Sequence, residues 1–199
     1  MSPGGARLFV AVDLPREVRA EIAGWGRRAV AGLGGVPGGV RPVEAGALHV
    51  TLCFLGAQPV DLVDEIAAAV AGAAAPVGPV GLGAPVWLPR RRPRALAVGL
   101  HDETGGLGDL AGDVGRALGE AIGWEPESRR FRPHVTVARM RAGAVVPGRV
   151  DPTPPLVFEP SGLTLYRSRL EPGGAVYEPV VRVGLSWPGA GIGGQGPEG

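Results

Sequence analysis

Cysteine and histidine are both scarce in this chain of 199 residues, which has one cysteine, Cys53, and three histidines. A single cysteine cannot close an intramolecular disulfide, so nothing indicates a secreted, disulfide-bonded protein, and we expect the cytoplasm. It also cannot build a thiolate metal site, and no third ligand stands at ligand spacing beside the histidine motifs described below. We therefore expect neither a metal nor another cofactor.

The chain also lacks an excess of charge and an unbroken apolar segment. Its 20 basic and 19 acidic residues leave a formal net charge of +1, so polyanion binding through bulk charge is excluded and any nucleic-acid contact must be local. The uncharged segment 66–89 is long enough to cross a bilayer, but prolines and glycines interrupt it repeatedly. We expect no membrane association and no targeting segment.

What the chain has in quantity is glycine, 35 residues, and proline, 21 residues. Together with a hydrophobic fraction of 45%, this composition indicates a compact protein with many turns rather than a disordered chain. The segment 188–199 has no hydrophobic periodicity, so we expect one domain over 1–187 followed by a disordered tail. Gly189, Gly191 and Gly194 form a G-x-G-x-x-G pattern in that tail, but no helix follows it, so dinucleotide binding is not indicated.

Hydrophobic periodicity predicts strands interspersed with three helices. The helices are expected from Pro15 to about Ala29, over 61–74 and over 103–122. The strands are expected over 7–12, 48–55, 80–88, 95–100, 131–138, 163–168 and 176–183. The strands on either side of the Pro/Arg-rich turn 89–94 are expected to form a hairpin. These elements favour an α+β fold with antiparallel sheets.

Two of the three histidines occur in the same local pattern, His49-Val50-Thr51-Leu52 and His134-Val135-Thr136-Val137. In a strand, residues i and i+2 project from one face, so each motif presents an imidazole beside a hydroxyl while the apolar residues point into the core. Two such strands brought together would make a cleft with two imidazoles around a common centre. Buried structural histidines are the alternative, but the repetition of the motif favours a site.

Paired histidines are suited to general acid–base catalysis, because the imidazole pKa lies near neutral pH. One ring can take a proton from water while the other gives a proton to a leaving oxygen. The two threonine hydroxyls can donate hydrogen bonds to a charged oxygen at the reacting centre, and a tetrahedral phosphate fits such an arrangement. The sequence symmetry leaves open which histidine is the acid and which is the base.

The chain resembles the RNA 2′,3′-cyclic phosphodiesterases, also called 2′-5′ RNA ligases, of the two-histidine phosphoesterases. The resemblance rests on four ordered segments, 7–11, 48–56, 131–139 and 165–168. It implies a bilobal fold in which two lobes, related by a pseudo-twofold axis, each have an antiparallel sheet and outer helices, with the active cleft between them. It also implies hydrolysis of RNA 2′,3′-cyclic phosphate ends to 2′-phosphomonoesters without metal.

Carried over residue by residue, the resemblance implies that His49 is the proton donor and His134 the proton acceptor. Thr51, Thr136 and Arg139 would then bind the phosphate. Strict alternation from His134 places Arg139 on the opposite face of its strand, so the sequence predicts a bulge or a strand end that turns it back.

Cys53 is the one departure, since the family often has Lys or Arg at that position. By alternation Cys53 is expected on the face of His49 and Thr51. A thiolate nucleophile there is a possible interpretation, although hydrolysis by two histidines needs no covalent step, and a small filler side chain is the favoured one.

Further contacts with RNA are predicted at Phe9, Tyr166, Arg90 and Arg94. Phe9, Tyr166 and also Trp87 are aromatic candidates for stacking on a terminal base, with core packing as the alternative. Arg90 and Arg94 belong to the basic cluster of the turn 89–94, which either contacts RNA phosphates or is simply solvated.

The partners expected are RNA 3′ ends or small cyclic nucleotide phosphates, bound by a monomer. Reversible 2′-5′ ligation, 2′-5′ phosphodiesterase activity on another nucleotide and an RNA-end binding module with little turnover remain as alternative functions.

Overall fold

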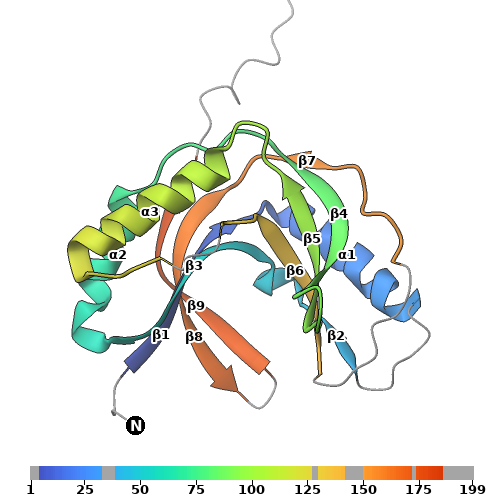
Figure 1. The fold of residues 1–199 in the computed structure, drawn as a ribbon, viewed down its shortest axis with the longest axis horizontal. Coiled ribbons are helices and arrows are strands. Elements are labelled where there is room, and N and C mark those ends of the chain that lie inside the picture. The colour runs from blue at the N-terminus through green and yellow to red at the C-terminus, as the bar shows by residue number, and fades with distance from the viewer. Residues whose placement is uncertain (1–4, 33–38, 127–129, 142–149, 172–173, 186–199) are drawn as a thin grey trace, which may run out of the picture.

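The computed structural model describes residues 5–32, 39–126, 130–141, 150–171 and 174–185 (Figure 1). The predicted tail 188–199 and its glycine pattern therefore lie outside the described residues. Within the described part, nine strands form one antiparallel sheet, and three α-helices pack against it. The predicted α+β class with antiparallel pairing is confirmed.

The predicted helices and strands are all present. In chain order the elements are β1 (Gly5–Asp13), α1 (Arg16–Gly32), β2 (Val40–Pro42), η1 (Ala45–Ala47), β3 (His49–Pro59), η2 (Val60–Leu62), α2 (Val63–Gly72), β4 (Val80–Leu88), β5 (Ala95–His101), α3 (Gly106–Ile122), β6 (His134–Met140), β7 (Val157–Phe158), β8 (Gly162–Glu171) and β9 (Gly174–Gly184). The predicted hairpin is the antiparallel pair β4–β5. Two strands were not anticipated, because β7 has two residues and β2 has three, one of them Pro42.

The sheet consists of two halves that meet at β3 and β6. Its strand order is β7-β4-β5-β6-β3-β1-β8-β9, with β2 added to β6 at the side. The two halves are joined by one pair of opposed residues, Val50 and Val135. The family resemblance implied an antiparallel sheet in each lobe; the described strands form one continuous sheet, because this single pair connects the two halves.

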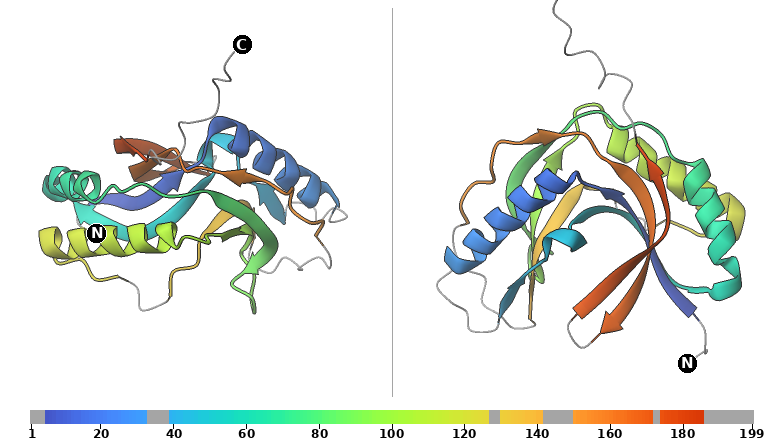
Figure 2. Two further views of the ribbon diagram at one scale, coloured as in Figure 1. Left: turned by 90° about the horizontal axis from the view of Figure 1, so that it is seen from above. Right: turned by 180° about the vertical axis from the view of Figure 1, so that it is seen from behind.

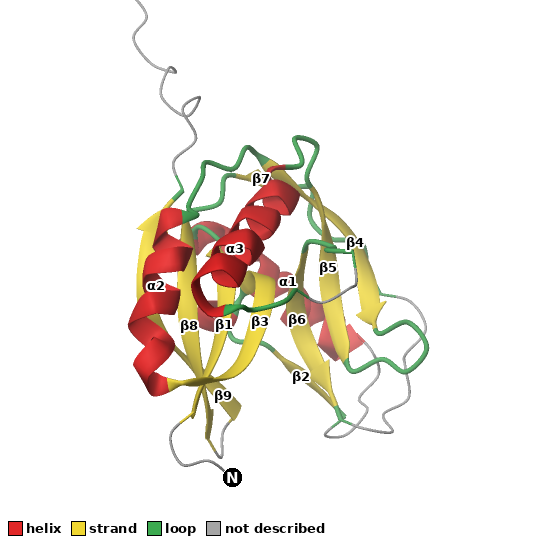
Figure 3. Ribbon diagram, turned by 60° about the vertical axis from the view of Figure 1, so that its left-hand side comes forward, coloured by secondary structure: helices red, strands yellow, loops and turns green. Residues whose placement is uncertain are grey.

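The helices divide between the two halves. Helices α2 and α3 lie side by side and contact β3, β8 and β9, whereas α1 packs against β2 and β6 (Figures 2 and 3). The periodic positions that predicted α1 form its buried face: Val18, Ile22, Trp25 and Ala29. No helix in the described ranges combines the length and the apolar character that a bilayer span needs.

Candidate active site

The two H-x-T motifs lie on β3 and β6, the neighbouring strands at which the two halves of the sheet meet. Val50 and Val135 are opposed across this join and are 1% and 0% exposed, so the residue after each histidine points into the core. The histidines and threonines of both motifs are only partly buried, on the other face. Residues placed like His49 and His134 are diagonal neighbours in an antiparallel ladder, with Cα atoms roughly 7–8 Å apart.

Each motif strand bulges one residue after its threonine. Between β1 and β3, Val10 pairs with Cys53 and Ala11 with Thr51, so Leu52 is the extra residue. Between β5 and β6, Leu96 pairs with Ala138 and Ala97 with Thr136, which makes Val137 the extra residue. A bulge shifts the alternation of side chains by one residue. The two half-sites thus share the same local irregularity at equivalent positions.

The bulge at Val137 returns Arg139 to the face of His134 and Thr136. Burial follows this shift, because Val135, Val137, Ala138 and Met140 are buried whereas Arg139 is exposed. The charge of Arg139 is also felt at His49, where it lowers the imidazole pKa. The expectation that a bulge re-aims Arg139 is confirmed, and Arg139 lies on the same face of the sheet as His134 and Thr136.

The bulge at Leu52 has the opposite consequence for Cys53. Cys53 packs against the core, and burial raises the pKa of its thiol to about 12. The expectation that Cys53 shares the face of His49 and Thr51 is wrong, because strict alternation does not hold through Leu52. The raised pKa disfavours a thiolate at neutral pH, and Phe54 occupies the position that corresponds to Arg139.

Both histidines are oriented by the main chain in the same way. The Nδ1 of His49 lies 2.8 Å from the carbonyl oxygen of Ala47, and the Nδ1 of His134 lies 2.8 Å from that of Arg132. A carbonyl oxygen can only accept, so Nδ1 carries a hydrogen in each ring and donates it. The Nε2 atom is thereby left as the ring nitrogen available for proton transfer in both motifs.

Aromatic rings surround His49 on the half-sheet formed by β1, β8 and β9. The ring of Phe9 lies 5.0 Å from that of His49, 5.2 Å from Tyr166 and 5.0 Å from Tyr177. Phe9 is 3% exposed, so it supports the imidazole and presents no free face for stacking on a base. The burial of His49 lowers its pKa to about 4, against the opposing effects of the Ala47 hydrogen bond and of the Asp13 charge.

A buried carboxylate lies beside this aromatic group. Asp13 is 1% exposed and is the residue opposite His49 in the β1–β3 ladder. Its Oδ1 accepts a hydrogen bond from the Tyr166 hydroxyl at 2.6 Å, and its Oδ2 accepts from Thr164 at 2.7 Å. Arg182 donates to Oδ2 from Nε at 2.7 Å and from Nη2 at 2.6 Å. Every donor that a buried carboxylate requires is therefore provided by β8 and β9.

Sequence reasoning did not single out Asp13, Thr164 and Arg182. An acidic residue directly after the buried run Leu8 to Val12 was the one available signal. It acquires partners only when β1 pairs with β8, about 150 residues away, and β8 pairs with β9. Tyr166 was predicted as a contact with RNA; its hydroxyl is engaged with Asp13, and burial followed by this hydrogen bond raises its pKa to about 12.

The remaining predicted RNA contacts lie on the hairpin β4–β5 and in its turn. Arg90 and Arg94 are exposed, as the predicted solvent-facing cluster requires. Trp87 is opposite the fully buried Leu96 and packs against the core, so it is a structural residue and not a stacking platform.

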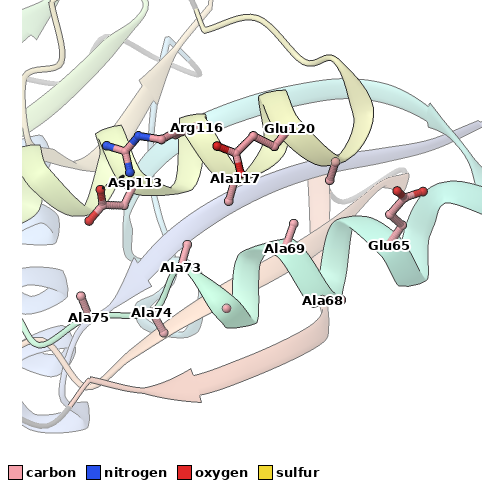
Figure 4. Close-up of a pocket in the computed structure, with 12 residues that line it drawn as sticks. Glu65, Ala68, Ala69, Ala73, Ala74, Ala75, Asp113, Arg116, Ala117 and Glu120 are labelled. Carbon is pink, nitrogen blue, oxygen red and sulfur yellow. Dashed lines mark hydrogen bonds and ion pairs between the residues drawn. The ribbon is translucent and has the colours of Figure 1, made fainter.

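A cavity lies elsewhere, between α2 and α3. Its volume is about 840 Å³, and Figure 4 shows alanines of α2 and of the segment that follows it on the side of the cavity opposite Asp113, Arg116 and Glu120 of α3. Asp113 and Arg116 form an ion pair of 2.9 Å within α3. None of the residues that line this cavity is a histidine, so it is separate from the motif residues. Over the described parts of the chain, no three His, Cys, Asp or Glu side chains gather as metal ligands.

Two histidines with free Nε2 atoms, two threonines and an arginine on one face define a phosphoesterase-like arrangement. Comparison with known families agrees, since a sequence model of the 2′-5′ RNA ligase superfamily matches residues 17–171. The chain belongs to the 2′-5′ RNA ligase superfamily, as its motifs predicted.

Curated relatives and solved structures resemble nearly the whole chain. The RNA 2′,3′-cyclic phosphodiesterase of Escherichia coli K12 is 31% identical over 185 residues, which cover 90% of this chain and 97% of that protein. The enzyme of the same name from Thermus thermophilus is 31% identical, with 86% of each chain covered. The structure of E. coli LigT complexed with 3′-AMP is 28% identical, has a TM-score of 0.75 and covers 92% of this chain and 99% of LigT. These matches confirm the predicted family.

Proposed function

We propose that this protein hydrolyses 2′,3′-cyclic phosphate ends of RNA to 2′-phosphomonoesters by metal-independent acid–base catalysis between His49 and His134. The observation that carries the proposal is the pairing of Val50 with Val135, which brings equivalent residues of the two motifs together with both Nε2 atoms available. The names of the curated relatives support the same reaction.

In the proposed reaction, the Nε2 of His134 takes a proton from a water molecule as the water oxygen forms a bond to phosphorus. The bond from phosphorus to the 3′ oxygen breaks, and Nε2–H of His49 gives its proton to that oxygen. The products are a 2′-phosphomonoester and a 3′ hydroxyl, and solvent returns the two rings to their starting protonation states. Each proton transfer contributes roughly a hundredfold to ten-thousandfold to the rate.

The other site residues are proposed to hold the phosphate. Thr51 and Thr136 share the face of the histidines, so their hydroxyls are placed to donate to the nonbridging oxygens. Arg139 adds a guanidinium fork, which matches phosphate geometry and neutralises its charge. Arg90 and Arg94 remain candidates for contacts with the RNA strand.

We further propose that residues 1–187 form one bilobal domain with a local twofold axis through the Val50–Val135 pair. The repeated bulges at Leu52 and Val137 and the equivalent anchoring of the two rings support such an axis. The substrate would lie in a cleft between the lobes, on the face of the sheet that carries His49 and His134.

The test is an oligoribonucleotide ending in a 2′,3′-cyclic phosphate, incubated with the protein and a chelator. We expect conversion to the 2′-phosphate, loss of conversion in His49→Ala and in His134→Ala, and unchanged conversion in His101→Ala. His101 is exposed and outside both motifs, so it is the matched control. Absence of product, or full activity in the double variant His49→Ala His134→Ala, would overturn the proposal.

The same reaction, run with an added RNA that has a 5′ hydroxyl, separates the alternatives. Joined RNA would indicate that 2′-5′ ligation is the dominant activity. Tight binding of the cyclic end without release of product would indicate a binding module.

A further inference from the structure

The two motif strands have equivalent neighbouring strands, but the residues opposite the two histidines differ. Strand β1 runs beside β3 as β5 runs beside β6, with Ala11 opposite Thr51 and Ala97 opposite Thr136. The residue opposite His49 is Asp13, whereas the residue opposite His134 is Gly99. One histidine thus has a carboxylate as its cross-strand neighbour, and its counterpart has no side chain there.

Side chains of directly opposed residues project from the same face, with Cβ atoms roughly 4.5–5.5 Å apart. The carboxylate of Asp13 is held in place by hydrogen bonds from Thr164, Tyr166 and Arg182, none of which involves His49. It therefore acts on His49 through its charge.

Arg182 does not cancel that charge at His49. It lies on β9, whereas Asp13 lies on β1, immediately beside the strand of His49, and neighbouring strands are roughly 4.8 Å apart. The negative end of the ion pair is consequently nearer to His49 than the positive end. The Arg182 side chain is also 54% exposed, so solvent screens its charge further.

The other charged and titratable groups around His49 act differently. His134 and Arg139 face it from β6, and both disfavour its protonated form. Tyr166 and Tyr177 face it from β8 and β9 as uncharged rings, 6.1 and 5.4 Å from the imidazole. Among the described residues, the negative charge that acts on His49 comes from Asp13.

We propose that Asp13 is a positioning residue for the acid step: its fixed, buried carboxylate stabilises the protonated form of His49, from which the proton passes to the leaving oxygen. This inference rests on the proposed function for its role in the reaction, whereas the electrostatic coupling between Asp13 and His49 is independent of any substrate. His134 has no carboxylate opposite it, because residue 99 is glycine. Its protonated form is therefore not stabilised in this way, which suits a proton acceptor.

The inference predicts opposite effects for two variants. Asp13→Asn keeps the size and most hydrogen-bonding capacity of the side chain but removes the charge, so protonated His49 is lost at lower pH. Arg182→Gln removes the cation and leaves the carboxylate, so protonated His49 persists to higher pH. A purely structural role would make both variants lose activity at every pH. Arg169→Gln is the matched control, since Arg169 pairs with Glu178 on the same two strands, β8 and β9.

The experiment follows the ring signals of His49 by NMR from pH 3 to 8 without substrate, alongside the pH profile of kcat on the cyclic-phosphate oligonucleotide. We expect the titration of His49 and the basic limb of kcat to shift down in Asp13→Asn and up in Arg182→Gln. The expected size in Asp13→Asn is on the order of one pH unit, a tenfold change in the protonated fraction, and the shift in Arg182→Gln is smaller because Arg182 is farther away and exposed. KM should change less than threefold in both variants.

An unchanged His49 titration in both folded variants, or shifts in the same direction, would overturn the inference. If Asp13→Asn does not fold, Arg182→Gln decides alone, because its upward shift is specific to the charge. Opposite titration shifts in a protein that hydrolyses no cyclic phosphate would support the coupling and refute the proposed reaction.

Discussion

The half-site of His49 and the half-site of His134 have the same backbone but opposite chemical surroundings. Both rings are anchored by a carbonyl two residues earlier, and both strands bulge after the threonine. Around His49 the variable positions are Asp13, Phe9 and Phe54; their counterparts around His134 are Gly99, Ala95 and Arg139. The repeated backbone orients the two imidazoles in the same way, but their surroundings differ: burial and the charge of Arg139 lower the pKa of His49, whereas the charge of Asp13 raises it.

The largest effect is expected from removing either imidazole. His49→Ala and His134→Ala should each lower kcat by roughly a hundredfold to ten-thousandfold, because each removes one proton transfer. His49→Ala should also remove the basic limb of the pH profile of kcat/KM, and His134→Ala the acidic limb. Single-turnover rates across pH 3 to 9 provide the measurement, and loss of the same limb in both variants would contradict the assignment of roles.

A second effect concerns the stability of the His49 half-site. The folded protein holds the pKa of His49 at about 4, below the unfolded value of 6.5, so the unfolded chain binds a proton first as the pH falls. Stability is therefore full above pH 6.5 and declines between pH 6.5 and 4. For this partly exposed ring we expect a loss on the order of 2 kcal/mol. Urea unfolding in a phosphate-free buffer should show a smaller decline in the free energy of unfolding over this pH range in His49→Gln. An identical decline would show that His49 is not its cause.

The third comparison sets Arg139 against Phe54, which occupy corresponding positions after the two bulges. Arg139→Ala should reduce kcat/KM by roughly tenfold to a hundredfold, the cost of a charge-assisted hydrogen bond. Phe54 is 62% exposed, and Phe54→Ala should change kcat/KM less than threefold. Equal losses in steady-state assays would indicate that the two positions have the same role.

The asymmetry can also be reduced by giving His134 the carboxylate it lacks. A Cβ at Gly99 would lie 3.5 Å from the carbonyl oxygen of Ala84, which is an ordinary contact, so a Cβ is accommodated there. In Gly99→Asp the added charge favours protonated His134, so the acidic limb of kcat/KM should move up by about one pH unit. Gly99→Asn is the uncharged control. Identical pH profiles of kcat/KM for Gly99→Asp and Gly99→Asn would show that a charge at position 99 does not act on His134.

The smallest effect is expected at Cys53. Because burial raises the pKa of its thiol to about 12, the folded protein should react with iodoacetamide at pH 7.5 far more slowly than the unfolded chain does. Cys53→Ala should retain activity within about twofold. Rapid labelling of Cys53 in parallel with loss of activity would indicate that its thiol is part of the active site.

The family, the class of fold and the motif residues could be predicted from the sequence because they depend on local signals. Alternation fixed the faces of His49, Thr51, His134 and Thr136, and the periodicity of the helices was equally direct. Alternation failed at Cys53, since a bulge is a property of the pairing between strands and leaves no clear mark in one of them. Asp13 was missed for a related reason: its partners come from β8 and β9, about 150 residues away, and only the register of the sheet brings them together.

The hydrogen bonds from Nδ1 of the two rings to the carbonyls of Ala47 and Arg132 have a consequence for how this protein can vary in evolution. Every amino acid supplies a main-chain carbonyl, so substitution of the side chain at either position leaves the acceptor in place. Insertions or deletions between the carbonyl and the histidine would remove it. The orientation of both imidazoles is therefore insensitive to drift in residue type and sensitive to changes in chain length.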